Sequence, residues 1–136
     1  MDENIEVEGA NKRFYTAFES LSLEEMDKVW NHDENTICIH PGWDLVTGWL
    51  AIRESWERIF ANTKSMKFII TNSKISINGD IAIVVCVENI ESTLNEQSVK
   101  FGVLATNIFK HCKGKWLLVH HHGSTILNYM PPNICS

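Results

Sequence analysis

Three consecutive histidines, His120, His121 and His122, stand in the stretch VHHHGST near the C-terminus. Histidine has the side-chain pKa closest to neutral pH, so it serves proteins as a general base, as a metal ligand and at half-polar interfaces. The apolar run before the triplet indicates a β-strand, in which neighbouring side chains point to opposite faces of the sheet. We therefore expect His121 on one face and the outer two histidines on the other, so that the three rings do not form one site.

A separate histidine, His40, ends a short apolar stretch and is followed by Pro41-Gly42, a pair typical of a turn. An imidazole at this position could remove a proton from a carbon next to a carbonyl near neutral pH. A metal site needs at least three convergent ligands, and His40 with His121 supply two. Asp44 or His32 could add a third, but the spacing requires neither. We therefore predict no metal site and no cofactor.

The bulk composition limits the class of protein. A chain of 136 residues, 44% of them hydrophobic, suits one globular domain. A net charge of -5 without a basic run argues against nucleic acid as a partner. The apolar run 81–87 is too short to cross a membrane, and the acidic N-terminus does not resemble a signal peptide, so a cytoplasmic location is expected. The four cysteines lack CxxC spacing and are predicted to be free thiols.

Three helices are predicted in the first half of the chain. Apolar residues recur every three or four positions between Val7 and Leu21, which indicates a first helix. Ser22 lies three residues before Glu25 in a capping box that begins a short second helix. A short strand is expected at 36–40, and a third helix is expected to begin near 47–48 with one apolar face.

The second half reads as a long antiparallel meander. The alternation changes phase near 72–74, which predicts a bulge, and the NGD turn at 78–80 predicts a hairpin in which Asn78 and Gly79 take positive φ. Strands are expected at 81–93, 99–111 and 115–124, followed by a loose tail. Because the first two of these strands are apolar in both phases, we expect helices to cover one face of the sheet and a second subunit the other.

Three stretches carry a family resemblance: CIHPGWDLVTGWLAIRESW, ISINGDIAIVV and KGKWLLVHHHGST. In order and spacing they resemble the SnoaL-like branch of the nuclear-transport-factor-2-like (NTF2-like, ketosteroid-isomerase-like) superfamily. The resemblance implies an α+β fold, in which three N-terminal helices pack on a strongly curved antiparallel sheet that wraps into a cone around a hydrophobic pocket. It also implies one domain over residues 1–125, a tail over 126–136 and a homodimer through the outer face of the sheet.

The resemblance also implies site residues. The ketosteroid isomerases place a general base where this sequence has His40, and a tyrosine oxyanion donor near Tyr15, although Phe14 could match instead. Their second donor is a protonated acid on the penultimate strand, where the best register puts Thr106, so no acid is expected there. The same register puts Val119, His121 and Gly123 inside the cone, with His120 and His122 outside.

Two functions remain open from the sequence. One is binding of a small apolar organic molecule, with possible isomerase or lyase chemistry at His40, His121 and Tyr15 in a cavity shaped by Trp43, Trp56, Thr106 and Val119. The other is a non-catalytic binding or association module similar to the calcium/calmodulin-dependent kinase II association domain. A cone interior filled by side chains, with no space beside His40, would argue against the enzyme.

Overall fold

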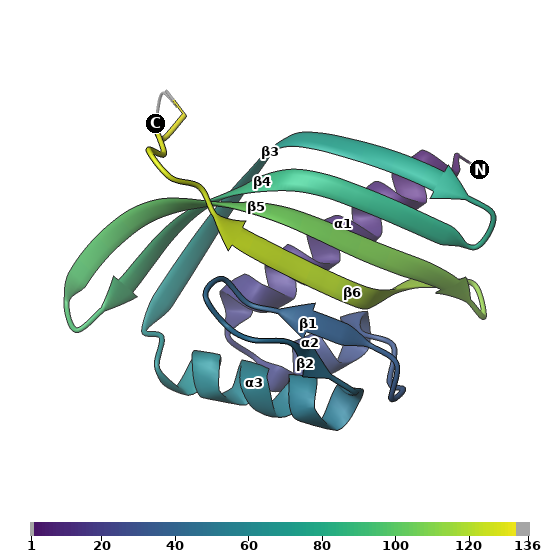
Figure 1. Ribbon diagram of the computed structural model, residues 1–136, viewed down its shortest axis with the longest axis horizontal. Helices are drawn as coiled ribbons and strands as arrows, with labels where there is room; N and C mark the ends of the chain where they lie inside the picture. The colour runs from purple at the N-terminus through teal and green to yellow at the C-terminus, as the bar shows by residue number, and fades with distance from the viewer. Residues whose placement is uncertain (1, 133–136) are drawn as a thin grey trace.

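The computed structural model describes residues 2–132, and within them the chain forms three helices and six strands (Figure 1). The helices are α1 (Glu3–Ser20), α2 (Leu23–Val29) and α3 (Trp49–Ala61). The strands are β1 (Ile37–Ile39), β2 (Val46–Thr47), β3 (Ser65–Asn78), β4 (Ile81–Leu94), β5 (Gln97–Cys112) and β6 (Lys115–Thr125). The expected α+β fold, with three helices on a curved sheet, is confirmed.

Local sequence explains where the first two helices begin and end. Asp2 caps α1 by accepting a hydrogen bond from the Asn4 amide, and Leu21 ends the helix in the left-handed region at φ 54°. Ser22 then caps α2, because its hydroxyl oxygen accepts a hydrogen bond from the Glu25 amide at 3.3 Å. The capping residue predicted from the sequence is therefore correct, and the tight connection places α2 against α1.

The strands form one sheet in the order β2-β1-β6-β5-β4-β3. Neighbouring strands are antiparallel except for β1, which runs parallel to β6 and pairs Cys38 with His121. The predicted bulge in β3 is present between Thr71 and Lys74, where Asn72 takes φ 55°. The sheet curves strongly and does not close, and its concave face holds the helices (Figure 1).

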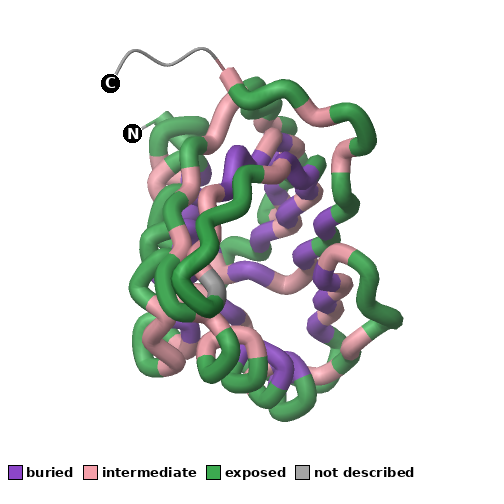
Figure 2. The backbone as a smooth tube through the Cα atoms, turned by 90° about the vertical axis from the view of Figure 1, so that its left-hand side faces the viewer, coloured by how far each residue is buried: buried purple, intermediate pink, exposed green. Residues whose placement is uncertain are grey.

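The core lies between the helices and the concave face of the sheet. α1 packs against β3 and β6, while α3 covers β1 and β2 at the lower end in Figure 1. Buried stretches of both layers face one another across this interior (Figure 2). Its largest fully buried apolar side chains are Trp30, Trp56, Phe14, Phe109, Met26, Ile52 and Leu118. None of the described helices is long and apolar enough to cross a membrane.

One additional strand and one turn differ from the sequence prediction. The strand β2, which pairs with β1 after the Pro41-Gly42 turn, was not expected. At the NGD turn, Asn78 stays on β3 and pairs with Ile81, and only Gly79 takes a positive φ, of 63°. Positive φ at the first central residue alone belongs to a type II′ turn and not to the predicted type I′.

The alternation predicted for β6 is also wrong, because the strand contains a bulge. Ile108 pairs with His120 and Phe109 with Leu118, which leaves Val119 as an extra residue. Strict alternation would place Trp116 and Leu118 on the outer face together with His120, but both are buried in the core, and His121 is buried beyond the bulge. Val119 is only half-buried and does not join His121 inside the cone.

Candidate functional site

His40 lies just beyond β1 and is enclosed by aromatic side chains. It is 2% exposed, and its ring centroid lies 4.7 Å from that of Trp56 and 4.9 Å from that of Trp43. Ser55 on α3 donates its hydroxyl proton to the Ile52 carbonyl, so the His40 Nε2–H donates to the Ser55 oxygen at 2.9 Å. Burial lowers the pKa of His40 to about 4, which keeps its imidazole neutral at pH 7.

His121 lies on the inner face of β6, with its ring centroid 6.5 Å from that of His40. Its Nδ1–H donates to the Asn107 side-chain oxygen at 2.6 Å. Burial, followed by the neighbouring imidazole of His40, lowers the pKa of His121 well below its usual value. The structure thus brings the two predicted histidines into one interior, and both are neutral at pH 7.

Asn107 connects His121 to Tyr15 on α1. One amide N–H of Asn107 donates to the Asn11 side-chain oxygen at 2.9 Å, and the other donates to the Tyr15 hydroxyl oxygen at 3.0 Å. The Tyr15 hydroxyl in turn donates to Glu88 Oε2 on β4 at 2.5 Å. Donors and acceptors therefore form one directed chain from His121 to Glu88, and the four side chains of this chain are all buried.

Glu88 is a buried carboxyl group that the sequence prediction missed. It is 2% exposed, and burial raises its pKa to about 7, although the hydrogen bond from Tyr15 opposes this rise. Burial of Tyr15 raises its pKa well above the usual value, and the charge of Glu88 is the second-largest cause of this rise. No acid was expected on the penultimate strand, and the buried polar residue there is Asn107; an acid reaches Tyr15 instead from the neighbouring strand β4, as Glu88.

Thr106 does not take the position expected for it. It pairs with Val85 and His122 on the outer face of the sheet, and the inward-facing residue is the next one, Asn107. The register carried over from the family resemblance was therefore wrong by one residue on β5. Such a slip moves a side chain to the opposite face of the sheet.

The cavity nearest to these residues lies between α1 and β3 and has a volume of about 450 Å³. Tyr15 and Asn11 belong to its lining, together with Phe68 and Ile70 of β3. His40 and His121 are not among its lining residues, because Phe14 and Trp56 stand against both sides of His121, with ring centroids 5.0 and 6.2 Å away. Of the three predicted catalytic residues, Tyr15 is the one at this cavity.

Two further observations concern the enclosed interior. The indole N–H of Trp56, which is fully buried beside His40, has no hydrogen-bond partner within residues 2–132. Trp43 is 39% exposed and lies over the outer edge of His40. Among the residues that the structure describes, no group of three His, Cys, Asp or Glu side chains is placed to hold a metal ion.

The comparisons with known proteins agree with this architecture. The profile of the SnoaL-like domain matches residues 7–128. A structure of a proposed dehydratase of the NTF2-like family from Streptomyces avermitilis is 33% identical, with a TM-score of 0.83 over 90% of this chain and 95% of that one. A proposed calcium/calmodulin-dependent protein kinase type II association domain from Thiobacillus denitrificans is 28% identical, with a TM-score of 0.79 over 88% of this chain and 94% of that one.

A curated relative places the same domain in a longer protein. The F-box protein SKIP8 of Arabidopsis thaliana is 29% identical over 117 residues, which are 86% of this chain and 48% of that protein. The chain thus spans about half the length of this relative. Profile, identity and topology together show that the chain belongs to the SnoaL-like domain family of the NTF2-like superfamily.

Proposed function

We propose that the protein binds a small, largely apolar organic molecule in the cavity between α1 and β3, with an oxygen atom of that molecule at Tyr15. The observation that carries this proposal is that Tyr15 lines the cavity, while its hydroxyl donates to the buried carboxyl of Glu88 behind it at 2.5 Å. The lining also includes the apolar side chains Phe68 and Ile70 of β3 and the charged residues Glu8, Lys12 and Glu19 of α1. A volume of about 450 Å³ falls in the range of small-molecule sites.

The proposed chemistry is proton transfer without a cofactor, of the isomerase or lyase type. With a pKa of about 7, Glu88 exchanges its proton near neutral pH. When Glu88 is protonated it can donate to the Tyr15 oxygen, which frees the tyrosine O–H to turn toward a ligand oxygen. His121 is joined to Tyr15 through Asn107, but neither His121 nor His40 lines the cavity, so the proposal gives neither histidine a contact with the ligand. Similarity to a proposed dehydratase supports this class of reaction, and a cytoplasmic setting is part of the proposal.

Thermal-shift screening with a panel of cyclic ketones and alcohols tests the proposal. Compounds that stabilise the wild type should bind Tyr15→Phe roughly fivefold to tenfold more weakly, since one hydrogen bond is lost. Tyr129→Phe is the matched control, because Tyr129 also donates a short hydrogen bond, to Asn89, but lies outside this cavity. Equal stabilisation of the wild type and Tyr15→Phe by every compound would contradict the proposal.

We also propose self-association through the outer face of the sheet. The residues of β4 and β5 that point away from the helices are largely apolar, and Ile83 and Leu104 are 38% and 47% exposed. His120 and His122 continue the same face on β6, opposite Ile108 and Thr106. Similarity to a proposed kinase association domain supports this second role, which is compatible with the first.

A further inference from the structure

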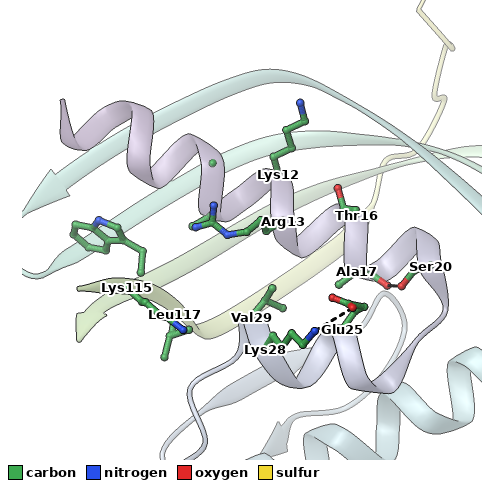
Figure 3. A pocket seen from close by; sticks show the side chains of 13 residues that line it. Lys12, Arg13, Thr16, Ala17, Ser20, Glu25, Lys28, Val29, Lys115 and Leu117 are labelled. Carbon is green, nitrogen blue, oxygen red and sulfur yellow. Dashed lines mark hydrogen bonds and ion pairs between the residues drawn. The ribbon is translucent and has the colours of Figure 1, made fainter. Parts of the chain in front are cut away.

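A second cavity lies on the other side of α1, between α1, α2 and the start of β6 (Figure 3). Its volume is about 590 Å³, which is within the range of ligand sites. Its lining includes the buried side chains of Ala10, Ala17 and Trp116 and the half-buried Val29 and Leu117. We call it the α1–α2–β6 groove. Thr16 and Lys12 line both this groove and the α1–β3 cavity, so they form the ridge between the two.

Cations gather around this groove although the chain as a whole carries a net charge of -5. Lys12, Arg13, Lys28 and Lys115 line it, against a single acid, Glu25. Arg13 extends from α1 toward the start of β6, where Lys115 lies, whereas Lys12 projects away from the groove along the ridge (Figure 3). The local charge is therefore opposite in sign to that of the whole molecule.

Most of this positive charge is not neutralised by the protein itself. Lys28 pairs with Glu25 at 3.2 Å, but both side chains are more than half exposed, so the pair is weak and can be displaced. Within residues 2–132, no ion pair engages the side chains of Lys12, Arg13 or Lys115. A guanidinium without a carboxylate partner is well suited to bind a carboxylate or phosphate through two hydrogen bonds.

Trp116 is the buried aromatic side chain in the lining of this groove. Its side chain is 4% exposed, and its indole N–H is buried without a hydrogen-bond partner among the described residues. A buried donor without an acceptor costs free energy, and most such donors in proteins are paired. The indole nitrogens of Trp30 and Trp56 are buried without a partner among the described residues in the same way, so the apolar ring of Trp116 is what the groove offers to a ligand.

From these features we propose that the α1–α2–β6 groove binds a small organic anion: an apolar body on the alanines, Val29 and Leu117, with a carboxylate or phosphate between Arg13 and Lys115. The apolar lining contributes affinity through burial, and the cations select for charge. The α1–β3 cavity differs in charge, because the charged residues in its lining are Glu8, Lys12 and Glu19, so acids outnumber cations there. Arg13 and Lys115 line this groove and not the α1–β3 cavity, so variants at these two residues test this site.

Calorimetric titration with octanoate, octyl phosphate and octanol tests the proposal. These probes share one chain length and differ in charge, so the two anions should bind at least about tenfold more tightly than octanol. The stronger anion shows which group the site favours. Raising the salt concentration should weaken the binding of both anions, because the cations are exposed to solvent.

Variants locate the binding and separate it from the proposed function. Arg13→Gln combined with Lys115→Gln should weaken anion binding about tenfold or more, whereas Arg58→Gln, which removes an exposed arginine on α3, should leave it unchanged. Tyr15→Phe should also leave it unchanged. Equal binding of octanol and octanoate, or full anion affinity in the Arg13/Lys115 double variant, would overturn the inference. Loss of octanoate binding in Tyr15→Phe would overturn it too, by placing the anion in the other cavity.

Discussion

At the scale of single residues, hydrogen-bond partners assign a different tautomer to each buried histidine. The Ser55 hydroxyl donates its only proton to the Ile52 carbonyl, so toward His40 it can only accept. His40 therefore carries its proton on Nε2. The Asn107 side-chain oxygen can only accept, so His121 carries its proton on Nδ1. The unprotonated nitrogens are therefore Nδ1 of His40, which lies 3.8 Å from the Cys38 sulfur and can accept from its thiol, and Nε2 of His121.

Replacing Glu88 by glutamine should change how stability depends on pH. Burial raises the pKa of Glu88 from 4.5 to about 7, so between these values the folded protein holds a proton that the unfolded chain has lost. The free energy of unfolding contributed by Glu88 therefore falls as pH rises through this window. We therefore compare the two proteins by subtracting the free energy of unfolding of the wild type from that of Glu88→Gln. This difference should rise by up to about 3 kcal/mol from pH 5 to pH 8.

Urea denaturation followed by tryptophan fluorescence at several pH values measures this difference. The buried histidines have the opposite pH dependence, but they are present in both proteins and cancel in the subtraction. The same subtraction for Glu57→Gln, a matched substitution at an exposed position of α3, is the control, and Glu88→Gln should show the larger change with pH. A pH-independent difference for Glu88→Gln would contradict a raised pKa at this position.

Part of the candidate site could be predicted from residue type, and part could not. His40, His121 and Tyr15 stand out because their side chains can do acid–base chemistry wherever they lie. Glu88 and Asn107 are residues that usually face solvent, and only the phase of their strands shows that they point inward. Since β4 and β5 are apolar in both phases, their sequences did not identify that phase.

At the scale of elements, periodicity predicted which segments are helices and strands but missed an irregularity inside β6. Alternation holds from Trp116 to Leu118 and again from His121 to Gly123, with Val119 as the extra residue between them. A bulge adds one residue to a strand, and no particular residue type marks its position in this sequence. Unbroken alternation was therefore the simplest expectation. The bulge allows Trp116 and His121 to share the inner face, which strict alternation would forbid.

The position of the segment after β6 depends on the absence of a side chain at Gly102. A Cβ atom added at Gly102 would lie 2.2 Å from Tyr129 Cδ1, and the Tyr129 hydroxyl donates to Asn89. Gly102→Ala should displace Tyr129, lower the free energy of unfolding by roughly 1–2 kcal/mol and speed amide exchange over residues 126–132.

A double-mutant cycle with Tyr129→Ala separates this contact from other effects of the alanine. Without the tyrosine ring the added Cβ has no close neighbour at that side, so Gly102→Ala should cost little in the Tyr129→Ala background. Strictly additive effects would contradict the packing of Tyr129 on Gly102. The segment expected as a loose tail is thus anchored at Tyr129, while residues 133–136 lie outside the described residues.

At the scale of the whole molecule, the helices cover the concave face of the sheet and leave the convex face without a layer. Because β4 and β5 are apolar in both phases, we expected both faces of the sheet to be covered. Among the described residues, the segment after β6 covers part of the convex face, where Tyr129 lies on Gly102. Ile83 and Ile108 are directly opposite each other, and Val87 is opposite Leu104, so these side chains form a continuous apolar patch. An exposed apolar patch of this kind indicates an association surface.

Wild-type protein at micromolar concentration should therefore sediment as a dimer, while Ile83→Glu combined with Leu104→Glu should sediment as a monomer. Two glutamates would bury charge at the centre of an interface that, in stable dimers, covers about 800 Å² on each partner. Leu50→Glu is the matched control, since Leu50 is 84% exposed on α3, away from the patch, and its variant should remain dimeric. A monomeric wild type, or a dimeric double variant, would refute association through this face. Because both substitutions point away from Tyr15 and from Arg13, ligand binding at either cavity should survive in the monomer, which would show that the sheet face and the two cavities act independently.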